Sequence, residues 1–278
     1  MAPTSIDRAP GAVGLYAALA VRGFRRYATY RAATAAGAFT NSVFGVIIAY
    51  TYVALWEARP DLGGYGVAQA LTFAWIAQAL IAPVGLFGGF IIDDLSERVR
   101  TGAAAIDLHR PVSLLGLRLA EDVGRAAYHL LARGLPPTVV GAILFDLAWP
   151  GRLVTWVAAL VAIGLAVVVG FGLRYLLGLL AYWIIDVQGP SWVLVVLQLF
   201  FSGMMLPLVV FPGWLRDVAD LLPFRCLVQI PIDVFLSNDT GTDVVPLLGV
   251  QLLWVGILLG AGATLTRVAV RKVVIQGG

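Results

Sequence analysis

The sequence predicts an all-α protein that crosses a membrane several times. Its mean hydropathy is +0.90, and hydrophobic residues make up 60% of the chain whereas charged residues make up 13%. Apolar runs longer than about 18 residues recur, and a helix of that length spans a hydrocarbon core about 30 Å thick. Strand-like alternation is absent, so helices must satisfy the backbone in lipid. We expect a single transmembrane domain over residues 1–278.

Six apolar segments have the length of transmembrane helices: 33–56, 67–92, 126–148, 153–174, 191–211 and 244–266. The third segment is interrupted by His129, by Arg133 and by the pair Pro136-Pro137. The prolines would kink the helix, and the Arg133 side chain would reach out to the inner membrane surface. The fourth apolar stretch continues beyond the length of one span, which leaves the path of residues 175–190 open.

The distribution of basic residues predicts the orientation of the chain. With six spans and both termini in the cytoplasm, the outer segments contain Arg59, Arg152, Arg216 and Arg225. Every other Lys and Arg except Arg174 then falls in an inner segment, as the positive-inside rule predicts. An extra crossing at 175–190 would place the basic C-terminus outside. The pI near 9.2 therefore reflects topology, and no nucleic-acid partner is expected.

Residues 12–32 are predicted to form an interfacial helix. At 100° per residue, its aromatic residues fall on one face, namely Tyr16, Phe24, Tyr27 and Tyr30. Such a helix lies along the inner membrane surface with its aromatic side in the lipid headgroups. A simple anchor and a mechanical role in coupling are both compatible with this pattern.

The loop over 93–125 is the longest predicted cytoplasmic connection. Asp94 resembles a helix N-cap with Glu97 at the third helical position, and Gly102 is expected to end the short helix. Beyond it, the loop offers apolar side chains to the aqueous side: Leu108, Pro111, Val112 and Leu114. Apolar groups rimmed by charge predict a protein contact, although a helix packing under the bundle would give the same pattern.

The segment 203–236 is predicted to lie on the outer side as a re-entrant helical hairpin. It is largely apolar but is broken repeatedly, at Gly203, Pro207, Pro212, Gly213, Pro223 and Pro231. Two short helices that return part-way into the membrane fit this pattern. Non-helical backbone at that depth must be shielded by protein or line a wet cavity.

The sequence lacks the motifs of a membrane enzyme. Lys272 is the only lysine, so the chain has no P-loop, and G-x-S-x-G and H-E-x-x-H are also missing. Cys226 is a single cysteine, and His109 and His129 are not spaced as metal ligands. We therefore expect no catalytic residues, no metal site and no cofactor in this chain.

Ionisable groups deep in the spans are scarce as well. Carriers driven by protons or sodium usually have carboxylates near the membrane midplane, whereas Asp146 and Asp186 fall near span ends. Arg174 is expected near the inner boundary, where its side chain can snorkel to water. Energy for transport is therefore expected to come from another chain.

Three stretches carry a resemblance to a known family. They are "GAAAIDLHRPVS" at 102–113, "SGMMLPLVVFPGWLRDVADLLPF" at 202–224 and "VVIQGG" at 273–278. In order and spacing the chain resembles the ABC type-2 (type V) exporter permeases, specifically the six-span bacterial subfamily of ABC-2 family transporter proteins. It departs from that pattern at His109, where an apolar residue is usual, and in the acidic pair Asp93-Asp94.

The resemblance implies a permease subunit of the bacterial cytoplasmic membrane, surrounded by lipid. Its expected partners are a cytosolic ABC ATPase dimer, which would hold Mg-ATP, and a second permease, identical or related. The ATPase would read the loop through Gly102 for the bend, Leu108 as a buried knob, Arg110 for a carboxylate and Pro111 to stop the helix. The alternative is that Arg110-Pro111 forms only a loop corner.

In similar permeases the second and fifth spans face the substrate cavity. The residues that would line it here are Gln78, Leu194, Gln198, Phe201 and Met205. Aromatic rings, a thioether and isolated amides suit an amphiphilic drug, toxin or lipid-like molecule, as in multidrug efflux. The same residues would also be expected where helices simply pack against each other. The rival within transport is an ATP-independent carrier or a substrate-capture subunit, which would need a buried coupling carboxylate.

Overall fold

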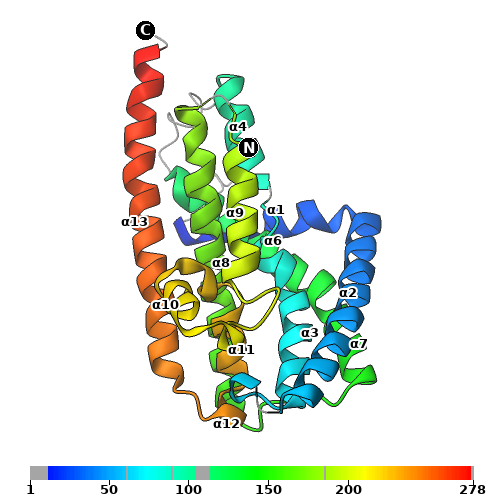
Figure 1. Ribbon diagram of the computed structural model, residues 1–278. Coiled ribbons are helices and arrows are strands. Elements are labelled where there is room, and N and C mark those ends of the chain that lie inside the picture. Colours follow the sequence, from blue (N-terminus) through cyan, green and yellow to red (C-terminus); the bar gives the residue numbers. More distant parts are fainter. Residues whose placement is uncertain (1–11, 61, 89, 104–112, 185, 277–278) are drawn as a thin grey trace.

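The computed structural model describes residues 12–60, 62–88, 90–103, 113–184 and 186–276 (Figure 1). All regular structure in these residues is helical. The α-helices are α1 (Ala12–Ala28), α2 (Arg31–Ala58), α3 (Val67–Val84), α4 (Phe90–Arg100), α6 (Leu114–His129), α7 (Leu135–Leu144), α8 (Leu153–Leu179), α9 (Gln188–Phe201), α10 (Gly213–Leu221), α11 (Gln229–Phe235), α12 (Ser237–Thr240) and α13 (Val244–Gln276). Short 3₁₀ or π turns are η1 (Leu62–Gly64), η2 (Leu130–Gly134), η3 (Leu180–Tyr182), η4 (Leu208–Val210) and η5 (Pro223–Cys226).

Four helices of the described chain are long and apolar enough to cross a membrane. They are α2, α3, α8 continued through η3, and α13 up to Ala269. These helices correspond to four of the six predicted spans and establish a multi-pass membrane protein. The other two predicted spans are not single long helices, so the six-span topology is not confirmed.

The third predicted span is divided between three elements. It begins in the last turn of α6, passes through the π turn η2 and ends in α7. The Leu135 N–H donates to the Leu130 carbonyl, five residues back, and Pro136 and Pro137 lie in the first turn of α7. Because prolines lack an N–H, they cannot complete the α-helical ladder with the preceding turn, and a wider π turn replaces it.

The second predicted span ends earlier than expected, at Val84 instead of residue 92. Gly85 adopts a left-handed conformation (φ 71°), and its N–H caps the last turn of α3. A new helix, α4, begins at Phe90, so Asp94 lies inside a helix and the predicted N-cap is wrong. The predicted helix end is confirmed, because Gly102 has φ 75° and its N–H donates to the Val99 carbonyl at 3.2 Å.

The path of residues 175–190 contains no extra crossing among the described residues. The helix of α8 continues through η3 to Tyr182, and α9 begins at Gln188 and runs back beside it (Figure 1). The fifth predicted span is shorter than expected, because α9 ends at Phe201. The next residues form short helices, as predicted for 203–236. The broken backbone is satisfied by protein: the Gln229 N–H donates to the Ser202 carbonyl at 2.9 Å.

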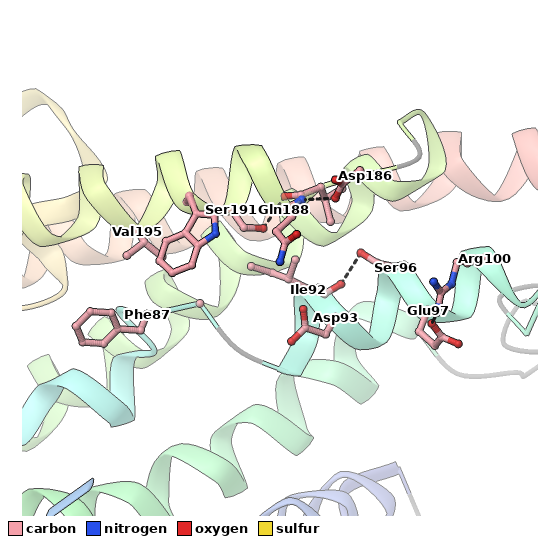
Figure 2. Close-up of a pocket in the computed structure, with 13 residues that line it drawn as sticks. Phe87, Ile92, Asp93, Ser96, Glu97, Arg100, Asp186, Gln188, Ser191 and Val195 are labelled. Atoms are coloured by element: carbon pink, nitrogen blue, oxygen red, sulfur yellow. Dashed lines mark hydrogen bonds and ion pairs between the residues drawn. The ribbon is translucent and has the colours of Figure 1, made fainter. Parts of the chain in front are cut away.

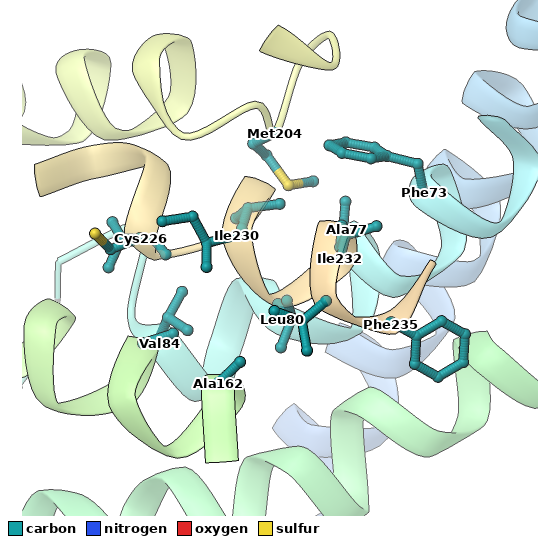
Figure 3. Close-up of a cluster of buried hydrophobic side chains, with 14 of the residues drawn as sticks. Phe73, Ala77, Leu80, Val84, Ala162, Met204, Cys226, Ile230, Ile232 and Phe235 are labelled. Atoms are coloured by element: carbon teal, nitrogen blue, oxygen red, sulfur yellow. The ribbon is translucent and has the colours of Figure 1, made fainter. Parts of the chain in front are cut away.

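The main core lies where α11 is enclosed by α3 and α8. Figure 3 shows Ile230 and Ile232 of α11 close to Leu80 and Val84 of α3 and to Ala162 of α8. These five side chains are at most 1% exposed. The predicted outer segment is therefore an integral part of the helix bundle.

The segment predicted as an interfacial helix does form a helix, α1, which lies across the long helices (Figure 1). Its aromatic face packs on α6, however, and the expectation that this face lies in the headgroups is wrong. Phe24 contacts Tyr128 edge-on with ring centroids 5.3 Å apart, and Tyr27 contacts His129 at 5.0 Å. Tyr30 follows α1 and is 64% exposed.

Glycines explain why α1 packs so closely on α6. A Cβ at Gly124 would lie 1.8 Å from the Ala20 carbonyl oxygen, and one at Gly23 would lie 2.1 Å from the Glu121 carbonyl oxygen. Each clash involves backbone, which cannot rotate away. Small residues at such contacts let two helix backbones approach each other.

We predict that Gly124→Val releases α1 from α6 without unfolding the spans. In detergent, trypsin should then cut after Arg22, Arg25 and Arg26 several-fold faster than in the wild type. Gly164→Val is the matched control, because a Cβ at Gly164 meets no atom within 4 Å. Equal cleavage rates in the two variants would contradict this account of the α1–α6 contact.

Candidate functional site

The candidate site lies at the end of the bundle that carries α4 and the C-terminal half of α13, which we call the α4 end (upper part of Figure 1). The orientation predicted from the basic residues places this end in the cytoplasm. Two features occur here: a cavity between α4 and α9, and a buried cluster of charges where α3, α6 and α8 meet.

The cavity has a volume of about 440 Å³, which is within the usual range of small-molecule sites. Figure 2 shows Phe87 at one end and Glu97 and Arg100 at the other. The lining contains three carboxylates and one guanidinium: Asp93, Glu97, Asp186 and Arg100. Two large aromatic residues of the lining remain open to contact, since Phe87 is 62% and Trp192 is 64% exposed.

The carboxylates of the cavity differ in their partners. Glu97 is paired with Arg100, and the Asp186 carboxylate accepts the Gln188 N–H at 2.8 Å. The Asp93 carboxylate makes no hydrogen bond or ion pair with a described residue. The net charge of the lining is negative and its walls include aromatic faces, an arrangement that attracts organic cations.

The buried charges centre on one carboxylate. Asp122 of α6 accepts from Arg174 of α8 at 3.1 and 3.0 Å and from Arg125 at 2.6 and 3.2 Å. We call these three residues the Asp122 cluster. The side chains of Asp122 and Arg174 are each 1% exposed. Burial alone would raise the pKa of Asp122, but the two guanidinium groups hold that pKa below its usual range.

The same guanidinium groups cap the end of α3. Arg125 donates to the Ala82 and Pro83 carbonyls at 2.7 and 2.8 Å, and Arg174 donates to the Val84 carbonyl at 3.5 Å. Within its own helix, Arg174 also donates to the Gly170 carbonyl at 3.0 Å. The last carbonyls of a helix have no partner within the helix, so cations stabilise them. Gly85 leaves the necessary space, because a Cβ there would lie 2.7 Å from the Arg174 guanidinium.

The prediction that Arg174 snorkels to water is wrong. Its side chain stays inside the bundle because Asp122 supplies a buried counter-charge. Sequence reasoning missed Asp122 because it lies in the stretch assigned to the cytoplasmic loop. The two residues are 52 positions apart. The one available signal was an arginine inside an apolar stretch, which requires a partner somewhere.

A further ion pair joins α4 to this region. Arg118 of α6 pairs with Asp94 of α4 at 2.7 Å, and these side chains are 9% and 17% exposed. Asp94 also pairs with Arg98 at 2.8 Å, and Arg118 with Glu121 at 3.1 Å. On its other side α4 packs on α8, where a Cβ at Gly178 would lie 2.7 Å from Leu95.

The predicted contact residues for an ATPase are only partly described by the structure. Gly102 ends α4, and a Cβ there would meet no atom within 4 Å. Leu108, Arg110 and Pro111 lie outside the described residues. Their role stays a prediction.

The predicted substrate-path residues do not gather around one cavity. Gln78 and Gln198 are buried, at 2% and 0% exposed, whereas Met205 is 66% exposed. Leu194, Gln198 and Phe201 share α9, but Met205 lies beyond the end of that helix, so the four do not form one continuous helical face. None of the five lines the cavity between α4 and α9.

Gln198 has an unusual environment. Both polar atoms of its amide are buried and have no hydrogen-bond partner. Buried polar groups are nearly always hydrogen-bonded, so an unpartnered amide in a helix interior calls for a functional or structural reason. Phe201, one turn further on, stacks on Phe224 with ring centroids 6.3 Å apart.

A second carboxylate was also missed from the sequence. At the opposite end of the bundle, Asp233 of α11 accepts from the Tyr65 hydroxyl at 2.5 Å and from the Gln229 amide at 2.8 Å. The spacing of Gln229 and Asp233, four residues apart on one helix, was the available local signal. Burial raises the pKa of Asp233 to about 6, although the Tyr65 and Gln229 hydrogen bonds lower it.

The fold and these sites define a multi-pass α-helical membrane protein. In the part of the chain that the structure describes, no group of three His, Cys, Asp or Glu is placed to hold a metal ion. Residues 42–277 match the family described as ABC-2 family transporter protein, and the chain belongs to that family. No match was found among curated proteins or among solved structures.

Membership fixes the general role of the chain. It is the membrane component of an ABC-2 transporter, it has no catalytic activity of its own, and it works with a partner ATPase subunit.

We predict that Asp122→Asn lowers the free energy of unfolding by about 3–5 kcal/mol, because it leaves two buried guanidinium groups without a counter-charge. The measurement is thermal unfolding in detergent, with the loss of the monodisperse species as the readout. Asp186→Asn is the control, since that exposed side chain only accepts one backbone N–H. A wild-type melting temperature for Asp122→Asn would show that the cluster does not stabilise the bundle.

We also predict a pH dependence from Asp233. Because its pKa is raised from 3.8 to about 6 by folding, the folded state binds the proton more tightly, and stability falls as pH rises between these values. Melting temperatures between about pH 4 and 7 should show this slope in the wild type and a flatter one in Asp233→Asn. Tyr65→Phe removes a hydrogen bond that lowers the pKa, so its transition should move to higher pH. An identical slope in Asp233→Asn would refute the assignment.

Proposed function

We propose that this chain is the permease subunit of an ATP-binding cassette exporter in a bacterial cytoplasmic membrane. It would cross the membrane six times with both termini in the cytoplasm. A cytosolic ATPase dimer would hydrolyse Mg-ATP, and a second permease, identical or related, would complete the transporter.

The observation that carries this proposal is a continuous mechanical link from α4 to the membrane-spanning helices. Gly102 ends α4 at the start of the loop that an ATPase would contact. The Asp94–Arg118 pair joins α4 to α6 at 2.7 Å, and the Asp122 cluster joins α6 to α8 and to the end of α3. A displacement of α4 would therefore move two candidate spans with it.

In this mechanism the partner ATPase pushes on the loop when it closes on nucleotide. Gly102, Leu108, Arg110 and Pro111 are the proposed contact residues. Buried ion pairs suit this task because they resist separation: removing one partner leaves an uncompensated charge. Helix α1, packed on α6 through Gly124, would move with the same unit.

The fourteen residues of α9 are too short to span a membrane alone. For six crossings, the backbone over 202–211 must complete the fifth span, and α6, η2 and α7 must together form the third. Support comes from the buried hydrogen bonds around Gln229, which satisfy the non-helical backbone there. The segment 203–236 would then be the re-entrant hairpin of the outer side.

The proposed cargo is an amphiphilic small molecule such as a drug, toxin or lipid-like compound. The cavity between α4 and α9 offers carboxylates and aromatic faces at the proposed cytoplasmic end. Deeper in the bundle, the unpartnered amide of Gln198 can hydrogen-bond a passing polar group. Gln78, Leu194, Phe201 and Met205 remain the other proposed residues of the path.

Purification from the native membrane in mild detergent, with mass spectrometry of the bound proteins, tests the proposal. We expect a stoichiometric P-loop ATPase that is lost when 102–111 is scrambled. Arg110→Ala should lower substrate-linked ATP hydrolysis several-fold while leaving membrane insertion intact, whereas Arg152→Ala, at the far end of the bundle, should not. Recovery of the folded chain without any ATPase would rule out ATP-driven export.

A further inference from the structure

A small basic cavity adjoins the cavity between α4 and α9, and Phe87 and Gly88 line both. Its volume is about 160 Å³, and α1, the end of α3, α6 and η2 form its walls. Its polar lining consists of Tyr27, Arg125, His129 and Arg133. None of the residues predicted for ATPase contact or for the substrate path lines this cavity.

Two groups of the cavity are left without partners. The Arg133 side chain makes no hydrogen bond or ion pair with a described residue, and its Nε is buried. The His129 Nδ1 is also buried without a partner, and the whole residue is 9% exposed. Leaving such a donor unsatisfied costs the full desolvation penalty of the group, which is larger for a charged group. A ligand that accepts hydrogen bonds would remove this penalty.

The local backbone holds these groups in place. Arg133 belongs to the π turn η2, and its guanidinium lies directly against Gly37 of α2, where a Cβ would come within 2.4 Å. His129 is fixed by ring contacts with Tyr27 and Tyr128, at centroid distances of 5.0 and 5.5 Å. Both groups are therefore positioned without a hydrogen bond of their own.

The positive charge around the cavity favours the binding of an anion. No carboxylate is among the lining residues, and Asp122, the partner of Arg125, is already shared by Arg125 and Arg174. On the adjoining surface, α1 contributes further guanidinium groups beside two neighbouring hollows, from Arg22, Arg25 and Arg26. A guanidinium and an imidazole N–H together match the oxygens of a phosphate.

The position of the cavity points to a lipid. It lies where α1, an amphipathic helix, meets the membrane-spanning helices, and the exposed ring of Phe87 supplies an apolar wall. Basic pockets between helices at the cytoplasmic side are suited to anionic headgroups. We propose that Arg133 and His129 bind the phosphate of an anionic phospholipid of the cytoplasmic leaflet.

Native mass spectrometry of the purified full chain with phosphatidylglycerol, and separately with phosphatidylcholine, tests this proposal. The wild type should retain phosphatidylglycerol preferentially. Arg133→Gln should weaken retention at least tenfold, and Arg133→Lys, which keeps the charge, should weaken it less. Arg152→Gln, a basic residue at the opposite end of the bundle, should bind as the wild type does.

Two further measurements complete this experiment. His129→Gln replaces the imidazole without changing a guanidinium, so it serves if Arg133→Gln fails to fold, and it should also weaken retention. Inorganic phosphate at millimolar concentration should not displace the lipid. Unchanged retention in His129→Gln and Arg133→Gln would overturn the site, and full displacement by inorganic phosphate would overturn its assignment to a lipid. Neither result depends on whether an ATPase co-purifies.

Discussion

One buried carboxylate holds the α4 end of this bundle together. Asp122 binds two guanidinium groups, and those groups in turn bind the carbonyls that α3 leaves free at its end. Three helices thereby share one charge balance. The arrangement resolves a difficulty common to membrane proteins, in which a helix end and an arginine both need polar partners where no water is available. The arginines donate to the carbonyls at the helix end, and Asp122 keeps the total charge of the buried cluster low.

Close helix contacts make that balance possible. A Cβ at Gly170 would lie 2.3 Å from the Val84 carbonyl oxygen, so α8 can approach the end of α3 only with glycine there. Gly85 leaves room for the Arg174 side chain in the same way. Lipid tails are as apolar as leucine, so burial of apolar surface does not drive helices together inside a membrane, and close packing with polar contacts takes its place.

The sequence predicted those features that depend on local composition. The helices α2, α3, α8 and α13 were recognisable because each carries a long apolar run, and the end of α4 was recognisable from Gly102. The end of α3 was missed because the sequence does not show which glycine adopts a left-handed conformation, and that conformation of Gly85 ends the helix. The pairing of Asp122 with Arg174 was missed because it is set by how α6 packs on α8. Asp233 was missed because Tyr65, its partner, lies 168 positions away.

The π turn η2 has a geometric consequence for the whole helix that runs from Leu114 to Leu144. A π turn holds one residue more than an α-helical turn, and one residue corresponds to about 100° of rotation. The faces of α6 and α7 are therefore out of phase. Asp122 can point to α8 while α7 packs on α2 and α3. A regular helix of the same length could not face α8 with its first half and α2 and α3 with its second. The extra residue of η2 therefore rotates the apolar half relative to the charged half.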